Sequence, residues 1–545
     1  ERPDIDQIYL TAAQLISGNA GWPLNAFALP DGRPFYAATY FPKKQWLRLL
    51  EQVADTYAND QRTLRTQASE LTKGVSIHDA FITEEEPAKK NFNELYTTWQ
   101  AQIDVDAGGL RGAPKFPLPS VWQSLLQHHY LTGDSAAIRA VTTTLDAMAD
   151  GGIYDHLAGG FARYSIDSLW RVPHFEKMLY DNAQLVSVYS NAFQVTANPR
   201  YKQVVQQTLD FIAEELTSED GAFFSSLNAD SEGEEGKFYV WTKAQIEQEL
   251  DRAQADIVIQ HFGITNEGNW EGGKNVLYRN NNTSIDIPDQ VRKKLLSARN
   301  RRVKPSIDTK ILTSWNALMI KGYIDAYFAF QDRSYLEAAL HAADYLEKHH
   351  AEKSGHVWRI KTEDRSVEGF LDDYALLAGA YIDLYQATFD LTWLQRAKAI
   401  ADYTLSNFLD NDSGLFYYTL DTMANQIAPK IEVRDQVIPS SNSVMAEVLF
   451  RLGELYDASE YRDQFEAMIA RISSDGLQTP YYANWMRVMG LHASKPYQVA
   501  VVGTEAAEKA QNLFSNYLPN ALLLGGTSEN LPLLENKSVK GKTII

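Results

Sequence analysis

Residues 315–330 read WNALMIKGYIDAYFAF, and after a short connection residues 335–347 read YLEAALHAADYLE. Apolar side chains recur at helical spacing in both stretches, so the sequence predicts two helices joined by a tight turn. The same unit is predicted over 182–196 with 201–216 and over 373–389 with 393–408, and looser copies start near Val121 and at Asn442. The chain is therefore built largely from a repeated helical hairpin.

The second helices of the three clear hairpins align with one another. They begin at Tyr201, Tyr335 and Trp393, and each leads into a glycine followed by aromatic residues, at 221–224, 355–358 and 414–417. The five visible hairpins, with a sixth starting at Phe92 or near Ile472, predict a mainly α, closed (α/α)6 toroid of the six-hairpin glycosidase type. An open solenoid is the alternative.

The repeat sets the domain boundaries. We predict the toroid over residues 92–494, with an insertion at 225–312 that is too long to be a simple loop. Residues 1–83 predict an incomplete thioredoxin-like α/β domain, because two short strands flank the Asp31-Gly32 turn and helices follow. We expect the strand and the helix that would carry a Cys-x-x-Cys motif to lie before residue 1. Residues 84–91 are a predicted linker, and 495–545 a small α/β segment.

Composition excludes several classes of function. The 545 residues carry a net charge of −19, which argues against broad binding to nucleic acid or anionic lipid. The cluster Arg299, Arg301, Arg302 and Lys304 is the best candidate for a basic patch, and a solvated loop explains it better. The chain has no cysteine, so disulfides and thiol chemistry within it are excluded. No apolar run approaches the roughly 18 residues of a membrane span, and we expect a soluble, cytoplasmic protein without metal or cofactor.

Candidate functional residues concentrate in the loops of the toroid, above all between Gly151 and Asn182. Imidazoles titrate near neutral pH and can move protons, and paired carboxylates are the usual catalytic groups of glycosidases. We therefore choose the catalytic candidates among the histidines and carboxylates. The catalytic candidates are His156, His174, Glu176, Asp230 and Asp372. The substrate-binding candidates are Tyr154, Asp155, Arg163, Trp170, Arg171, Tyr180, Asp181, Glu232, Asp308, Trp315, Asn316, Asp373 and Tyr374.

Each of these candidates also has a structural explanation. The two histidines could be hydrogen-bonded loop residues, the aromatic residues could be core, and one of Asp372 and Asp373 could cap a helix. The acidic run at 230–235 suits a hard cation such as Ca²⁺, or is a solvated turn, and its spacing misses the EF-hand pattern.

Several motifs together resemble a known family. They are GWP at 21–23, DGRPF at 31–35, GAPKFP at 112–117, VPHFEKMLYD at 172–181, ADSE at 229–232, TSWN at 313–316 and FLDDY at 370–374. The chain resembles the YyaL-type thioredoxin-domain-containing family, which is related to animal spermatogenesis-associated proteins. That resemblance implies a thioredoxin-like domain joined to an (α/α)6 barrel like that of N-acylglucosamine 2-epimerases.

Two classes of function follow. In the first, the chain is a carbohydrate-active enzyme with a small-molecule or oligosaccharide substrate. As an epimerase or isomerase it would use His156 and His174 to move a proton while Arg163 or Arg171 steadies the enediolate. As a glycosidase-like enzyme it would use a carboxylate pair from Glu176, Asp230 and Asp372. In the second, it is a non-catalytic, chaperone-like protein whose toroid holds a glycan or a partner protein, and its thioredoxin-like module serves for docking.

Overall fold

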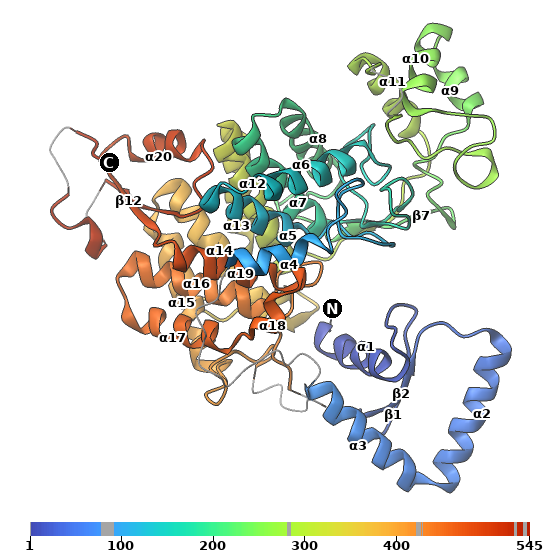
Figure 1. Ribbon diagram of the computed structural model, residues 1–545, viewed down its shortest axis with the longest axis horizontal. Helices are drawn as coiled ribbons and strands as arrows, with labels where there is room; N and C mark the ends of the chain where they lie inside the picture. Colours follow the sequence, from blue (N-terminus) through green and yellow to red (C-terminus); the bar gives the residue numbers. More distant parts are fainter. Residues whose placement is uncertain are drawn as a thin grey trace.

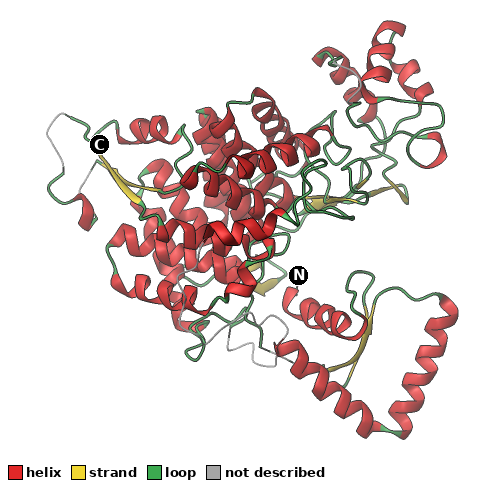
Figure 2. Ribbon diagram, in the orientation of Figure 1, coloured by secondary structure: helices red, strands yellow, loops and turns green. Residues whose placement is uncertain are grey.

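Six helices form a closed ring at the centre of the computed structural model (Figure 1). Each helix contacts the next along the chain, and the last contacts the first, so the ring has no open end. The predicted mainly α, (α/α)6 toroid is therefore confirmed, and helices dominate the fold (Figure 2). The ring helices are α5 (Pro119–Thr132), α7 (Leu179–Thr196), α12 (Thr313–Phe330), α14 (Leu371–Thr388), α16 (Ser441–Tyr456) and α19 (Ala483–Ala493).

The structure describes residues 2–77, 92–280, 285–420, 427, 429–527, 531–537 and 542–545. The predicted linker at 84–91 lies outside them.

An outer layer of helices packs on the ring. The outer helices that follow a ring helix directly are α6 (Ser135–Asp150), α8 (Pro199–Glu215), α13 (Arg333–His349), α15 (Leu391–Asn407) and α17 (Ser459–Arg471). The sixth unit draws on both ends of the barrel segment: α4 (Phe92–Gln100) lies against the segment leading into α19, where the Trp99 indole N–H donates to the Leu477 carbonyl at 3.0 Å. Two short elements, α18 (Ser474–Leu477) and η3 (Pro480–Tyr482), precede α19.

An asparagine side chain ties successive hairpins together. The Asn316 amide, near the start of α12, accepts from Phe223 N at 2.8 Å and donates to Phe223 O at 2.9 Å. Asn182 makes the same pair of bonds with Phe161, and Asn442 makes it with Phe416. Phe223 and Phe416 belong to the glycine-aromatic turns found in the sequence, and Phe161 follows Gly159-Gly160. The repeat thus reflects a shared hydrogen-bonded clamp that satisfies buried backbone groups.

The long insertion leaves and rejoins the barrel through one small sheet. That sheet consists of β5 (Lys177–Met178), β6 (Ser226–Leu227) and β9 (Ile307–Asp308) in antiparallel pairing. Between β6 and β9 the helices α9 (Lys243–Glu249), α10 (Arg252–Phe262) and α11 (Asp289–Arg299) enclose a core of their own. Figure 1 shows these green helices projecting from the barrel. The remaining short elements here and in the barrel loops are β3 (Tyr164–Ser165), β4 (Pro173–His174), β7 (Asp230–Ser231), β8 (Glu234–Glu235), η1 (Glu271–Gly273), β10 (Trp358–Lys361) and β11 (Ser366–Glu368).

A smaller α/β module lies at each end of the chain. The first has α1 (Pro3–Ser17), an antiparallel hairpin of β1 (Asn25–Ala28) and β2 (Pro34–Ala38), then α2 (Lys43–Asn59) and α3 (Gln61–Ile77). The second pairs β12 (Tyr497–Val502) in parallel with β13 (Ala521–Gly526), joined by α20 (Ala506–Phe514), and η4 (Pro532–Leu534) follows. The first module reaches the barrel where the Lys430 amine donates to Gln7 Oε1 at 2.7 Å.

Candidate functional site

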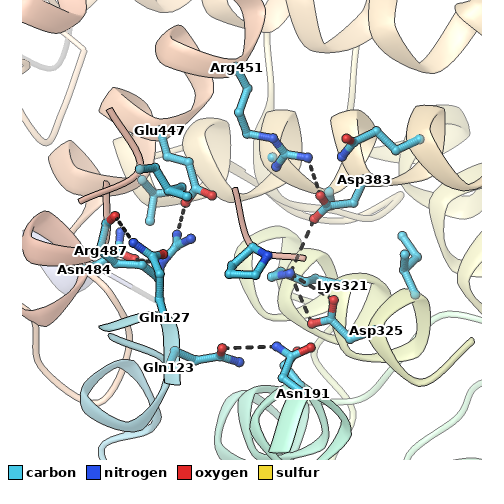
Figure 3. A pocket seen from close by; sticks show the side chains of 18 of the residues that line it. Gln123, Gln127, Asn191, Lys321, Asp325, Asp383, Glu447, Arg451, Asn484 and Arg487 are labelled. Carbon is cyan, nitrogen blue, oxygen red and sulfur yellow. Dashed lines mark hydrogen bonds and ion pairs between the residues drawn. The ribbon is translucent and has the colours of Figure 1, made fainter. Parts of the chain in front are cut away.

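A polar cavity of about 240 Å³ runs along the axis of the helical ring (Figure 3). All six ring helices line it, and residues 514–522 of the C-terminal module line it as well. The space is large enough for several water molecules, or for a small polar ligand in their place.

Charged side chains of both signs face the cavity. Those that line it are Lys321, Asp325, Asp383, Glu447, Arg451 and Arg487, so three cations balance three carboxylates. The Lys321 amine lies 3.1 Å from Asp325 Oδ2 and 3.8 Å from Asp383 Oδ2, and the Arg451 guanidinium contacts Asp383 Oδ1 at 2.5 Å. Arg487 pairs with Glu447. The ion pairs form two groups: Lys321, Asp325, Asp383 and Arg451 link α12, α14 and α16, and Glu447 with Arg487 links α16 to α19 (Figure 3). These six side chains are called the charged ring below.

The surroundings separate the pKa values of these groups. Burial raises the pKa of Asp325, and Lys321 only partly opposes it. Burial also acts to raise the pKa of Glu447, but the charges of Arg487 and Arg451 reverse the effect and the net pKa is lowered. Burial lowers the pKa of Lys321, yet the carboxylates around it, Asp325 first, outweigh burial and the net pKa is raised. The ring therefore holds one carboxyl disposed to keep a proton and one disposed to lose it.

Amide side chains complete the lining, and some polar atoms lack a partner. The Asn191 amide donates to Gln123 Oε1 at 3.1 Å, and the Gln127 amide donates to the Arg487 carbonyl at 2.7 Å. Gln127 is 1% exposed, and its Oε1 has no hydrogen-bond partner in the structure. Asp383 Oδ2 also lacks a hydrogen bond. A buried acceptor left unsatisfied costs about 1–3 kcal/mol, so these atoms favour a hydrogen-bonding occupant.

Sequence reasoning missed this site because its residues lie inside the ring helices and not in the loops. One signal was available. In α12 the only charged residues are Lys321 and Asp325, four positions apart in an otherwise apolar helix, and α16 carries Glu447 and Arg451 at the same spacing. Residues at i and i+4 share one face, so such a pair in a fully buried helix points to a polar interior.

The predicted loop at 151–182 separates into two groups. In the first, Asp155 lies buried between Lys177 and Arg299, with its Oδ2 and Oδ1 each 2.8 Å from one of these cations. Burial would raise the pKa of Asp155, but the Arg299 and Lys177 charges drive it far below its usual value. This ion pair fastens the insertion, through α11, onto the barrel loop.

His156 belongs to the same junction. Its Nε2 lies 2.9 Å from the Gly151 carbonyl, and its ring packs edge-on against Phe262 of the insertion. Burial lowers its pKa to about 4. His156 is therefore neutral at neutral pH and does not line the axial cavity.

The second group gathers at the ends of β4 and α7. His174 Nδ1 lies 2.7 Å from Glu235 Oε1, and the Arg163 guanidinium lies 3.2 Å from Glu176 Oε2. The two histidines have different partners, and none of the described residues that line the axial cavity is a histidine.

Beside this group, Asp181 is 1% exposed, and burial raises its pKa well above the usual range. Tyr180 meets Trp315 edge to face at 4.8 Å.

Asp372 and Asp373 start α14 and share one cation. Arg359 Nη1 lies 3.1 Å from Asp372 Oδ2 and 3.0 Å from Asp373 Oδ2, and the Tyr418 hydroxyl donates to Asp372 Oδ1 at 3.1 Å. Asp373 also accepts from Phe370 N at 3.0 Å, which is a capping role. Burial and the neighbouring Asp373 raise the pKa of Asp372.

The remaining predicted residues are scattered. Trp170 is buried and donates to Ala107 O, Tyr154 donates to Gln207 Oε1, and Tyr374 stacks on Tyr403. Arg171 lies over the Tyr278 ring, Asp308 pairs with Lys310, and Glu232 pairs with Lys237 at the surface. Asp230 is exposed. Within the described ranges, no group of three His, Asp or Glu side chains is placed to hold a metal ion, and no helix is long and apolar enough to cross a membrane.

Comparison with known proteins relates the whole chain to a group of animal proteins. The family model Thioredox_DsbH, described as a protein of unknown function, DUF255, matches residues 1–76. Spermatogenesis-associated protein 20 of Homo sapiens is 30% identical over 595 aligned positions, covering 96% of this chain and 75% of that protein. The Mus musculus protein of the same name is 29% identical, with the same coverage of 96% and 75%.

Among solved structures, a D-mannose isomerase matches with a TM-score of 0.49 at 12% identity, covering 74% of this chain and 95% of that chain. A cellobiose 2-epimerase from Spirochaeta thermophila DSM 6192 matches with a TM-score of 0.46 at 12% identity, covering 79% and 97%. The names of the two animal relatives state no activity.

Proposed function

This chain belongs to the spermatogenesis-associated protein 20 family, and we propose that its axial cavity binds a neutral, polyhydroxylated molecule of monosaccharide size. The observation that carries the proposal is the ring of three cations and three carboxyl groups around a 240 Å³ space, five of whose six side chains are at most 20% exposed. Burying ion pairs returns little stability, because desolvation offsets the attraction between the charges. Because the ring adds little stability of its own, its presence is better explained by the binding of a ligand.

The chemistry of the ring favours hydroxyl groups over ions. Each hydroxyl can donate to a carboxylate and accept from a guanidinium or an amide, and the unpartnered Gln127 Oε1 needs a donor. Because every cation of the ring already lies beside a carboxylate, an ionic ligand would have to displace one of these partners.

We further propose that the chain is a carbohydrate-active enzyme in which Asp325 and Glu447 act as the acid and the base. Opposite pKa directions in one site suit these two roles. In an isomerisation, Glu447 would take the proton from the carbon beside the sugar carbonyl. The electron pair would form an enediolate, Lys321 would face its negative charge, and a proton from Asp325 would return to carbon or oxygen. The paired-histidine version is not proposed, because neither histidine lines the cavity.

The test is sugar binding with a matched pair of variants. Lys321 and Asp325 form an i,i+4 pair inside the ring, and Lys398 and Asp402 form the same pair on the outer helix α15. The two lysine side chains are similarly accessible, at 43% and 40%, but the accessible surface of Lys321 faces the cavity. Lys321→Met should weaken binding of D-glucose or D-mannose at least tenfold in calorimetry, and Lys398→Met should leave it unchanged.

Activity has its own readout. Each sugar is incubated with the protein in D₂O, and loss of the C2 proton signal is followed by NMR. Exchange that is abolished by Glu447→Gln supports the enzyme. Binding without exchange would leave a sugar-binding protein, and the absence of both binding and exchange for neutral sugars would refute the proposal.

A further inference from the structure

The C-terminal α/β module closes one end of the axial cavity. The Gln194 amide, near the end of α7, donates to the Phe514 carbonyl at 2.7 Å. Near the end of α14, Gln386 Oε1 accepts from Leu523 N at 2.8 Å, and the Tyr385 hydroxyl accepts from Gly525 N at 3.2 Å. The module is thus fastened across the C-terminal ends of ring helices, where Figure 1 shows α20 and β12 in red beside the barrel.

Tyr517 and Asn520 are two of the residues with which this module forms the floor of the cavity. Tyr517 lines it and meets Tyr130 edge to face at 5.9 Å. Burial raises the pKa of Tyr517, and the charges of Arg487 and Asp325 also act on it, so its hydroxyl lies near the charged ring. Asn520 is 7% exposed, lines the same space, and its Oδ1 has no hydrogen-bond partner in the structure.

We propose that the C-terminal module forms part of the ligand site, with Tyr517 and Asn520 contacting the ligand and setting its size. This inference rests on the proposed function and names the substrate more closely. The ligand is a single sugar unit and not an oligosaccharide, because residues 514–522 block the axial direction along which a second unit would extend. Tyr517 offers a hydroxyl donor and an aromatic face, and Asn520 offers an amide acceptor.

Binding constants of Tyr517 variants test the contact and the size limit. Tyr517→Phe removes only the hydroxyl, so D-glucose or D-mannose affinity should fall roughly threefold to tenfold. Tyr517→Ala opens the floor and should raise the affinity for cellobiose relative to the monosaccharide at least tenfold. Tyr497→Phe is the control, since Tyr497 lies in β12 of the same module, 65% exposed and outside the cavity lining. If both Tyr517 variants bind the sugars with wild-type affinity, this inference is refuted. The proposed function is not, as long as the native chain binds sugar.

A second measurement needs no sugar. Because the chain has no cysteine, Ala380→Cys places one thiol on α14, at a cavity-lining position that is 2% exposed. The rate at which a small, positively charged methanethiosulfonate reagent modifies this thiol reports access to the cavity. Adding Tyr517→Ala should speed the reaction at least tenfold, and Tyr497→Phe should not. An unchanged rate with Tyr517→Ala would show that the module is not the floor, whatever the outcome of the sugar titrations.

Discussion

The Asp383–Arg451 pair offers the sharpest test of why the barrel buries charge. Both side chains are nearly enclosed, at 12% and 9% exposure. Arg451→Met would leave Asp383 with only the amine of Lys321 at 3.8 Å. Removing one partner of a buried pair costs about 3–5 kcal/mol, because the other charge stays desolvated and uncompensated. Replacing both partners in Asp383→Leu/Arg451→Met removes that penalty and should return the stability to within about 1 kcal/mol of wild type.

Thermal and urea unfolding, followed by tryptophan fluorescence, give the readout. Globular proteins gain about 2.1 cal/mol/K of unfolding entropy per residue, so a barrel of about 400 residues gains roughly 0.85 kcal/mol/K. A loss of about 4 kcal/mol should therefore lower the melting temperature of Arg451→Met by about 5 °C. The surface variant Lys398→Met should change the unfolding free energy by less than about 1 kcal/mol.

Ligand binding must follow a different pattern. Both the single and the double variant should lose sugar affinity, since both lack the guanidinium in the ring. A double variant as unstable as the single one would show that the pair itself stabilises the barrel. A stable double variant that still binds sugar normally would refute the idea that the ring is kept for the ligand.

Three further outcomes follow from the structure. Burial raises the pKa of Asp435 to about 7, so its neutral form adds stability that is complete below about pH 4 and lost as the pH rises to about 7. Asp435→Asn should remove the resulting loss of unfolding free energy between pH 5 and pH 8, about 3 kcal/mol, measured by urea unfolding. Asn316→Ala breaks the clamp on Phe223 and should cost about 2–4 kcal/mol, against less than about 0.5 kcal/mol for the exposed Asn300→Ala. Gly355 and Gly414 both have positive φ, but an added Cβ would lie 2.1 Å from Ala399 O at Gly355 and at least 3.8 Å from its nearest neighbour at Gly414. Gly355→Ala should therefore lower the unfolding free energy by more than Gly414→Ala does, for which we expect a loss of roughly 1–2 kcal/mol.

Each of these has a result that contradicts it. Parallel pH profiles for wild type and Asp435→Asn would mean that this carboxyl titrates normally in the native state. Equal costs at Asn316 and Asn300 would remove the clamp as the basis of the repeat. Equal costs at the two glycines would mean that the backbone around Gly355 yields to the added methyl group.

The toroid could be predicted because its repeat has a local physical cause. The glycine-aromatic turns and the helical periodicity are both visible in the sequence, and an asparagine clamp like that of Asn316 on Phe223 fastens three of the hairpins. The sixth unit was harder to assign. Its ring helix α19 and the helix α4 beside it come from opposite ends of the barrel segment, and no local pattern joins residues 92–100 to 483–493.

The interior site was hidden for a different reason. Loop residues such as His156 and Asp155 attract attention because polar groups cluster there. The structural role of Asp155 is not visible in the sequence, because one of its two partners, Arg299, lies 144 positions away. The cavity residues are spread singly or in i,i+4 pairs over the ring helices. Only ring closure brings Lys321, Asp383 and Glu447 around one axis, and sequence spacing does not record closure.

The pairing of the ring's charges limits what the cavity can hold. A sugar phosphate would compete with Asp383 for Arg451, or with Glu447 for Arg487, and would leave a buried carboxylate without its cation. That exchange costs as much as the single substitutions above, about 3–5 kcal/mol, before any gain from the new contact. A neutral hydroxyl can donate to the carboxylate of a pair and accept from its cation, and so leave the pair in place. The −19 net charge of the chain does not carry over to its cavity, because the ring holds as many cations as carboxyl groups.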